Sequence, residues 1–248
     1  MLFRSLSGFM IGFALAIAGL IVASRFPTQE PVVARKRALA EEIRDGFAFV
    51  RQEPLLRGIV ACALCWNMAF LALAAVYVPF ALRRLAMAPD SIGLAQSAMG
   101  AGSILAALTA GWALTKFPPR FLLFFGPASS TIAPVLLLNA SELGGFGSSV
   151  VAYFLLGFGP ILWFVCQNTI RQLVTPKGLL GRVGAVIQLA IYGVRSLGAL
   201  LGGHVAATYG FDAAIAMIIV LFALSTLAIP LSALGTLSAM PRSAGSPA

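Results

Sequence analysis

The sequence predicts an all-α membrane protein with seven transmembrane helices. Three observations support this fold class. The 248 residues are 60% hydrophobic and only 10% charged, the mean hydropathy is +0.96, and long apolar runs alternate with short basic segments. Soluble domains carry about 25% charged residues. A chain of this composition therefore has too little polar surface to face water on all sides, and the lipid bilayer is the expected solvent.

The predicted spans follow from the length of the apolar runs. A helix that crosses the hydrocarbon core needs about 20 mostly apolar residues. The segments that meet this length are 5–24, 58–82, 91–115, 121–139, 148–170, 183–207 and 213–235. Only the segment 183–207 contains ionisable cationic side chains, Arg195 and His204. Strands of a membrane barrel would alternate apolar and polar residues over about ten positions. These runs are continuous, so we expect helices.

The segments outside the main spans have distinct patterns. Residues 1–24 could be a signal peptide, but the apolar run of about 20 residues exceeds the 7–15 typical of one, which favours a retained helix. Residues 25–56 form the longest connection. Within it Leu39, Ile43, Phe47 and Val50 recur at helical spacing, which predicts an amphipathic helix at the membrane surface. Residues 236–248, rich in Ser, Ala and Pro, are expected to form a disordered tail.

The distribution of basic residues predicts the orientation. One side of the predicted membrane carries Arg25, Arg35, Lys36, Arg37, Arg44, Arg51, Arg57, Lys116, Arg120, Arg171, Lys177, Arg182 and Arg242, and the other side carries Arg4, Arg83 and Arg84. The richer side is expected to be cytoplasmic, which puts the N-terminus outside and the C-terminus in the cytoplasm. The net charge of +9 is thus assigned to lipid headgroups, and no nucleic-acid partner is expected.

The residue patterns of intramembrane enzymes are missing from this sequence. It contains no HExxH motif, no pair of carboxylates within the spans and no Walker A motif. Cys62 and Cys65 have CxxC spacing, but there is neither a second CxxC nor a neighbouring histidine, so we interpret both as small packing residues. We expect no enzymatic activity, no metal and no cofactor. Function must then depend on polar groups inside the helix bundle.

The most informative polar group is Arg195, near the middle of its span. An arginine at this depth costs about 2.5–3.5 kcal/mol on insertion scales. It should bind a substrate or couple protons, or else bond to backbone carbonyls or reach water as a structural residue. Gln188, Tyr192 and Arg195 share one helix face, which predicts a cavity wall; interhelical hydrogen bonding is the alternative. Further cavity candidates are Asn67, Trp163, Gln167 and Asn168.

Small residues indicate close contacts between helices. Gly198 and Gly202 form a GxxxG pattern that is followed by Gly203, and such patterns let two helix backbones approach. The segment 157–160, Gly-Phe-Gly-Pro, is interpreted as a kink or another close contact. These patterns predict tight helix packing and do not identify a substrate.

Four segments resemble, in the correct order, transporters of the major facilitator superfamily. "EEIRDGFAFVRQEPLLRGI" resembles the linker and the entry to the seventh helix, and "IGLAQSAMGAGSILAALTAG" resembles the eighth helix. "RQLVTPKGLLGRVGAV" resembles the loop between the tenth and eleventh helices, and "YGVRSLGALLGG" resembles the eleventh helix. The loop motif is matched by Arg171, Gln172, Thr175, Pro176, Gly181 and Arg182. Ser196 stands where many relatives carry proline.

The resemblance is greatest to the drug- and siderophore-exporter branch, which includes the enterobactin exporter and macrolide efflux proteins. It implies that residues 1–24 are the family's sixth helix and 25–56 its cytoplasmic linker. It also implies that residues 57–235 are a C-terminal six-helix half bundle of 3+3 inverted repeats.

The function that the resemblance implies is secondary active transport. A small amphipathic compound, a drug or a siderophore, would leave the cell in exchange for protons across a bacterial inner (plasma) membrane. The implied partners are the lipid bilayer, the small-molecule substrate, protons, and an N-terminal half or a second copy of the chain. The alternative is a truncated, non-transporting membrane fragment or a structural or regulatory membrane protein.

Overall fold

A computed structural model describes residues 10, 13, 17, 19–22 and 39–241 of the chain. The chain divides into two compact units, Met1–Ala38 and Leu39–Ala248. In the first unit the described residues are helical, and most of the predicted span 5–24 lies outside the described residues. The second unit holds the helix bundle and the site.

The second unit is built from helices, and its longest elements run up and down in succession. They are α3 (Pro54–Arg83), α4 (Pro89–Lys116), α5 (Pro119–Leu138), α7 (Gly145–Val174), α8 (Leu180–Tyr209) and α9 (Phe211–Leu227), with the shorter α2 (Leu39–Gln52), α6 (Ala140–Leu143), η1 (Lys177–Leu179) and η2 (Ala233–Thr236). Five segments are long and apolar enough to cross a membrane: α3, α4, α5, α7 and η1 with α8. They coincide with the spans predicted between residues 58 and 207.

The last predicted span, 213–235, begins within a helix of the structure but extends past the end of that helix. The helix α9 begins at Phe211 and ends at Leu227, because Pro230 has no backbone N–H and its ring would clash with the carbonyl of Thr226. The chain then turns into η2, where the side chain of Leu234 is fully buried. A disordered tail was expected from residue 236, but Leu237 and Met240 pack against the core. Residues 242–248 lie outside the described residues.

Proline and glycine mark the ends of the helices. Pro54, Pro89 and Pro119 each occupy the first turn of a long helix, where a missing N–H costs nothing because the first turn has no acceptor for it. The turns that precede α7 and α9 reverse at Gly144 (φ 91°) and Gly210 (φ 89°). Glycine populates positive φ without steric cost, so both turns stay short.

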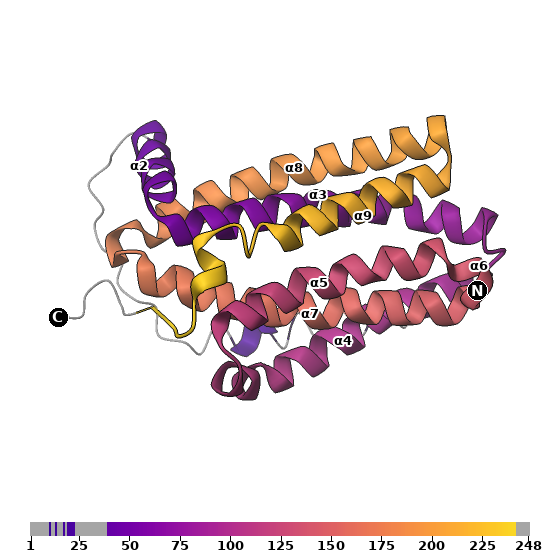
Figure 1. Cartoon of the computed structure of the whole chain (residues 1–248), viewed down its shortest axis with the longest axis horizontal. Coiled ribbons are helices and arrows are strands. Elements are labelled where there is room, and N and C mark those ends of the chain that lie inside the picture. The colour runs from indigo at the N-terminus through magenta and orange to yellow at the C-terminus, as the bar shows by residue number, and fades with distance from the viewer. Residues whose placement is uncertain (1–9, 11–12, 14–16, 18, 23–38, 242–248) are drawn as a thin grey trace. The chain divides into compact units, whose positions relative to one another are not determined.

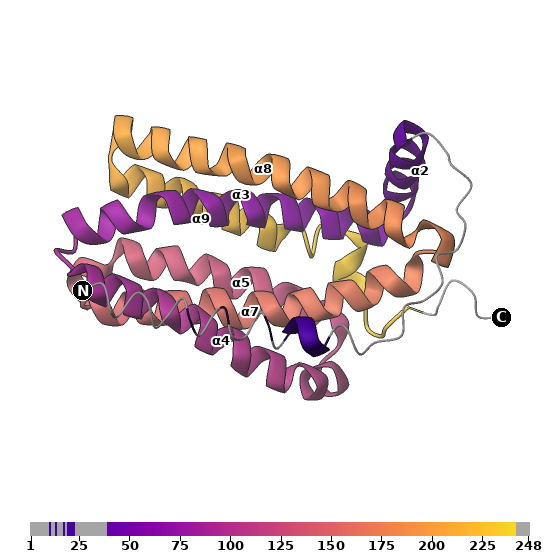
Figure 2. The same ribbon diagram turned by 180° about the vertical axis from the view of Figure 1, so that it is seen from behind.

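The long helices form two groups of three, which Figures 1 and 2 show from opposite sides. Helix α3 packs against α8 and α9, and helix α7 packs against α4 and α5. We call these sets the α3 group (α3, α8, α9) and the α7 group (α4, α5, α7). The two groups meet mainly where α5 contacts α9. This arrangement leaves room for a cavity between α3, α7 and α8.

Glycines lie at the closest contacts within each group. A Cβ atom added to Gly198 of α8 would strike the backbone carbonyl of Met68 in α3, and one added to Gly157 of α7 would strike the carbonyl of Met99 in α4. Gly202 similarly faces the Ala72 carbonyl, at 2.7 Å from an added Cβ. Gly203 was also predicted to pack, but among the described residues nothing lies within 4 Å of its added Cβ. It points away because it is one residue, or about 100°, further around the helix.

The amphipathic helix α2 lies across the beginning of α8 (Figure 1). The guanidinium of Arg182 contacts the carboxylates of Glu42 at 3.5 Å and Asp45 at 3.3 Å. Gly46 permits this approach, since an added Cβ would lie 2.8 Å from the Arg182 carbonyl oxygen. Both ion pairs are partly exposed, and such pairs contribute about 0–1 kcal/mol each. The backbone contact at Gly46 is therefore the stronger constraint on α2.

We expect Gly46→Val to release α2 from α8. An added side chain at a packed contact costs about 1–3 kcal/mol, which raises the population of undocked α2 by roughly 5- to 150-fold. Limited trypsin digestion of the purified protein should then cleave faster after Arg44 and Arg51. Gly184→Val is the matched control, because nothing lies within 4 Å of a Cβ added there. Equal cleavage of both variants would show that this contact does not hold α2.

Candidate functional site

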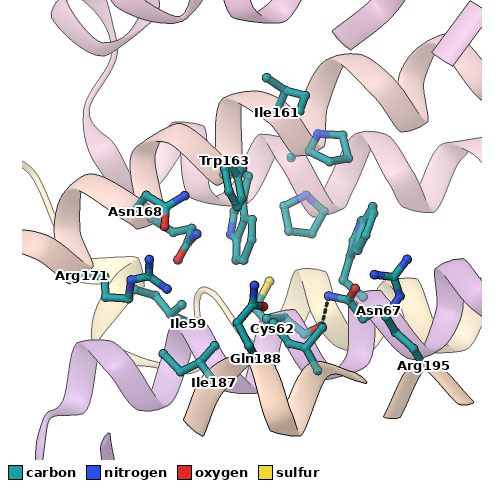
Figure 3. A pocket seen from close by; sticks show the side chains of 18 of the residues that line it. Ile59, Cys62, Asn67, Ile161, Trp163, Asn168, Arg171, Ile187, Gln188 and Arg195 are labelled. Atoms are coloured by element: carbon teal, nitrogen blue, oxygen red, sulfur yellow. Dashed lines mark hydrogen bonds between the residues drawn. The ribbon is translucent and has the colours of Figure 1, made fainter. Parts of the chain in front are cut away.

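A cavity of about 330 Å³ lies between the two helix groups and is lined by α3, α5, α7 and α8 (Figure 3). The structure brings all of the predicted cavity residues to its wall: Asn67, Trp163, Gln167, Asn168, Gln188, Tyr192 and Arg195. They come from helices far apart in the sequence. Apart from Arg171, the remaining lining is apolar and aromatic, which is typical of small-molecule sites that place a few polar groups in an apolar wall.

Helix α8 contributes the polar face that the sequence predicts. Arg195 lies midway between Leu180 and Tyr209, the ends of α8, and its side chain is half-buried. Within the described part of the chain it has neither a hydrogen bond nor an ion pair. Tyr192 is 60% exposed, and Gln188 is exposed as well. The cavity is therefore open on its α8 side.

Helix α7 contributes the most buried polar groups. Gln167 is only 6% exposed, and its side-chain amide has no hydrogen-bond partner among residues 39–241. The indole Nε1 of Trp163 is also buried without a partner in that part of the chain. Gly126 of α5 packs directly on the Cβ of Trp163. The amide of Gln167 can both donate and accept, so it remains available to a molecule bound in the cavity, whereas the Trp163 Nε1 is enclosed by the protein.

Helix α3 contributes Asn67 and an ordered aromatic ring. The indole Nε1 of Trp66 donates a hydrogen bond of 2.9 Å to Ser130 Oγ, and the ring stacks on Phe70 with a centroid distance of 5.0 Å. The side-chain amide of Asn67 donates to the Ala63 carbonyl at 2.8 Å. These bonds hold both side chains in place, so this wall of the cavity is preorganised before anything binds.

Positive charge dominates the cavity. Arg195 and Arg171 both line it, and no Asp or Glu of the described residues does. In Figure 3 Arg195 and Asn67 are drawn at one end, whereas Arg171 and Asn168 are drawn at the other. Arg171 has no ion pair with any residue that the structure describes. The site can therefore bind and orient a polar molecule through donated hydrogen bonds and positive charge.

The sequence reasoning missed several lining residues. Arg171 was assigned only to the loop motif, although it follows Gln167 by four positions and Asn168 by three, which puts all three on one helix face. Ile59, Cys62 and Ala63 also line the cavity; together with Trp66, the neighbour of Asn67, they recur at three- and four-residue spacing along α3. In both helices, a spacing of three or four residues from a polar residue already predicted to line the cavity could have identified these additional lining residues.

The sequence of this chain matches a known protein family. A family model described as Major Facilitator Superfamily matches residues 3–199. The chain belongs to the major facilitator superfamily. Among curated proteins and solved structures, none matches its sequence. A major facilitator protein is a membrane-embedded transporter of small molecules, and this assignment agrees with the five helices that can cross a bilayer.

In this major facilitator protein the loop motif shapes the turn between α7 and α8. Gln172 lies exposed in the last turn of α7, and Thr175 is the buried residue that caps it. Pro176 precedes η1, and Gly181 and Arg182 begin α8. Apart from Arg171, none of these motif residues lines the cavity. Their place indicates a structural role at the end of the bundle where α2 lies.

Proposed function

We propose that this chain is the C-terminal part of a secondary active transporter of the drug- and siderophore-exporter branch, and that it exports a small amphipathic compound in exchange for protons. The observation that carries the proposal is Arg195, which lines a cavity halfway along α8 and has no partner among the described residues. A cation at this depth costs about 2.5–3.5 kcal/mol, and ionisable residues retained at such a cost are functional in most membrane proteins. The cavity residues named above form the substrate site.

The bundle is a half of the major facilitator type with 3+3 inverted repeats, α3–α5 and α7–α9. The pairing of helices supports this assignment. In such repeats α3 corresponds to α7, α4 to α8 and α5 to α9. The observed contact of α4 with α7 then corresponds to the observed contact of α8 with α3. The contact of α5 with α7 likewise corresponds to that of α9 with α3. Glycine mediates a close approach in both pairs, at Gly102 of α4 against Phe154 and at the corresponding Gly198 of α8 against Met68.

A second six-helix bundle completes the transporter, either within one polypeptide or as a second copy of this chain. The open α8 side of the cavity supports this part of the proposal, because Leu197 and Leu200 extend the exposed surface beyond Tyr192. Rocking of two bundles around a central cavity would expose the site to each side of the membrane in turn. The proton-carrying carboxylate is assigned to that second bundle, since the described cavity lining has none.

The protein is oriented with α2 in the cytoplasm of a bacterium, and the membrane is the inner (plasma) membrane. Helix α2, the α4–α5 turn and η1 lie at one end of the bundle (Figure 1). Basic residues gather there: Arg44, Arg51, Arg57, Lys116, Arg120, Arg171, Lys177 and Arg182. The opposite end carries Arg83 and Arg84, and Arg84 pairs with Asp212 at 3.5 Å. An excess of Lys and Arg is typical of cytoplasmic ends.

Transport by the purified full chain tests this proposal. Proteoliposomes loaded with neutral, cationic or anionic fluorescent dyes should release at least one dye when a pH gradient is imposed, and a protonophore should stop the release. Arg195→Ala should abolish it, whereas Arg84→Ala, at the outer end, should not. A monodisperse protein that moves no dye would instead favour the alternative, a non-transporting membrane protein with a structural or regulatory role.

A further inference from the structure

We propose that the molecule bound in the cavity is an organic anion, and that Arg195 binds its carboxylate while the aromatic wall holds its apolar body. The inference rests on the proposed function and names the charge class of the compound that is transported. It follows from three features of the cavity: its charge, its unpartnered donors and its aromatic rings.

The charge of the cavity disfavours a cation. Two guanidinium groups, of Arg171 and Arg195, line it, and the described lining includes no carboxylate that could neutralise them. An organic cation would meet like charge in a region of low dielectric, where electrostatic interactions are stronger than in water. An anion would instead supply the counter-charge that neither arginine has among the described residues.

The unpartnered polar groups fit an acceptor. Gln167 is more than nine-tenths buried and lacks a hydrogen-bond partner in the described part of the chain, and the Trp163 indole N–H is in the same state. Leaving such groups without partners is unfavourable. A guanidinium presents a planar pair of donors that matches the two oxygens of a carboxylate. Arg195 is thus suited to bind the charged group, and the amide of Gln167 on α7 can donate to a further acceptor.

The rings on the cavity wall fit an apolar body. Trp66 is held by its bond to Ser130, and Trp163, Phe164 and Tyr192 line the same space. Aromatic side chains supply large contact areas at little cost in conformational entropy. A hydroxylated or strongly hydrated anion would leave these rings unused. The expected ligand is therefore amphipathic, with one anionic group and a flat or aliphatic body.

Isothermal titration calorimetry of the full chain in nanodiscs tests the inference, with three probes that share one body: 2-naphthoate, 2-naphthamide and 2-naphthylmethylammonium. Naphthoate should bind tighter than naphthamide by roughly 10- to 150-fold, the range of a charge-assisted hydrogen bond. The ammonium should bind weakest. Arg195→Gln should remove the preference for the carboxylate and leave the affinity for the amide unchanged, and Arg195→Lys should retain part of the preference.

The matched control is Arg84→Gln, which removes an arginine whose only described partner is exposed Asp212. Size-exclusion chromatography of each variant shows whether it is folded. The inference is overturned if no probe binds, if the amide or the ammonium binds as tightly as the carboxylate, or if the preference survives Arg195→Gln. The second of these results is expected if a carboxylate from a second bundle neutralises Arg195, and the third if Arg171, which also lines the cavity, binds the carboxylate instead.

The same probes separate this inference from the proposed function. Binding that is selective for the carboxylate and depends on Arg195, without transport in proteoliposomes, would support the anion site and contradict the transporter proposal. Transport of all three probes at equal rates would support the transporter proposal and contradict the anion site.

Discussion

Gly198→Ala is expected to destabilise the helix bundle by about 1–3 kcal/mol, the usual cost of overpacking. For a domain of this size that corresponds to a thermal midpoint lower by roughly 2–12 °C. The added Cβ would strike the carbonyl of Met68, so α3 and α8 would have to separate. Helices in lipid associate through close van der Waals packing and not through a hydrophobic driving force, and separation at this contact loses much of that packing.

Gly203→Ala is the matched control for this prediction. It makes the same chemical change five positions along the same helix, but no described residue lies within 4 Å of the Cβ that it would add. Alanine favours a helix over glycine by about 0.8–1.0 kcal/mol. The two substitutions should therefore shift the thermal midpoint of the purified protein in opposite directions. Equal shifts would contradict a tight contact at Gly198.

The second large effect concerns water access to the cavity. In a background with Cys62, Cys65 and Cys166 replaced by alanine, Gln188→Cys should react with an anionic, membrane-impermeant thiosulfonate on the order of 100-fold faster than Val220→Cys. The factor follows from the cost of about 2.5–3.5 kcal/mol for bringing a charged group into hydrocarbon. Both positions are exposed in the isolated bundle, but only Gln188 faces the cavity.

This pair distinguishes a water-filled cavity from a surface that faces lipid. Val220 lies on α9 and is 56% exposed, so its low reactivity cannot come from burial in the bundle. Saturating 2-naphthoate should slow the labelling of Gln188→Cys and leave Val220→Cys unaffected. Similar reaction rates at the two positions would mean that the polar face of α8 does not border an aqueous cavity.

Much of the fold could be predicted from the sequence, because the length and hydropathy of a segment decide whether it can cross a bilayer. Five of the predicted spans coincide with helices of the structure, and of these only 121–139 extends beyond its helix, by one residue. The end of the last span was wrong because the apolar composition continues past Pro230, whereas α9 already ends at Leu227. The hydropathy of a segment does not reveal that proline removes a backbone hydrogen bond of the helix. Pro230 itself, however, is visible in the sequence and could have predicted the end of the helix.

The candidate site was predictable in part, for a related reason. A polar residue in an apolar helix is conspicuous by itself, so Asn67, Gln167 and Arg195 could be selected one helix at a time. Arg171 could not, because it stands at the boundary between α7 and a basic turn and there resembles any other cytoplasmic arginine. Its place in the cavity depends on how α7 is rotated against α3 and α8.

The sequence by itself determined that this protein belongs in a membrane, where its main helices lie, and which of their side chains are too polar for lipid. These are properties of single segments in one solvent. Only the tertiary structure decided that those side chains surround one cavity whose described lining has no acid, that Gly198 and not Gly203 meets α3, and that α2 lies on α8. Such contacts depend on the rotation and offset of helices that are distant in the chain, which no local pattern of residues specifies.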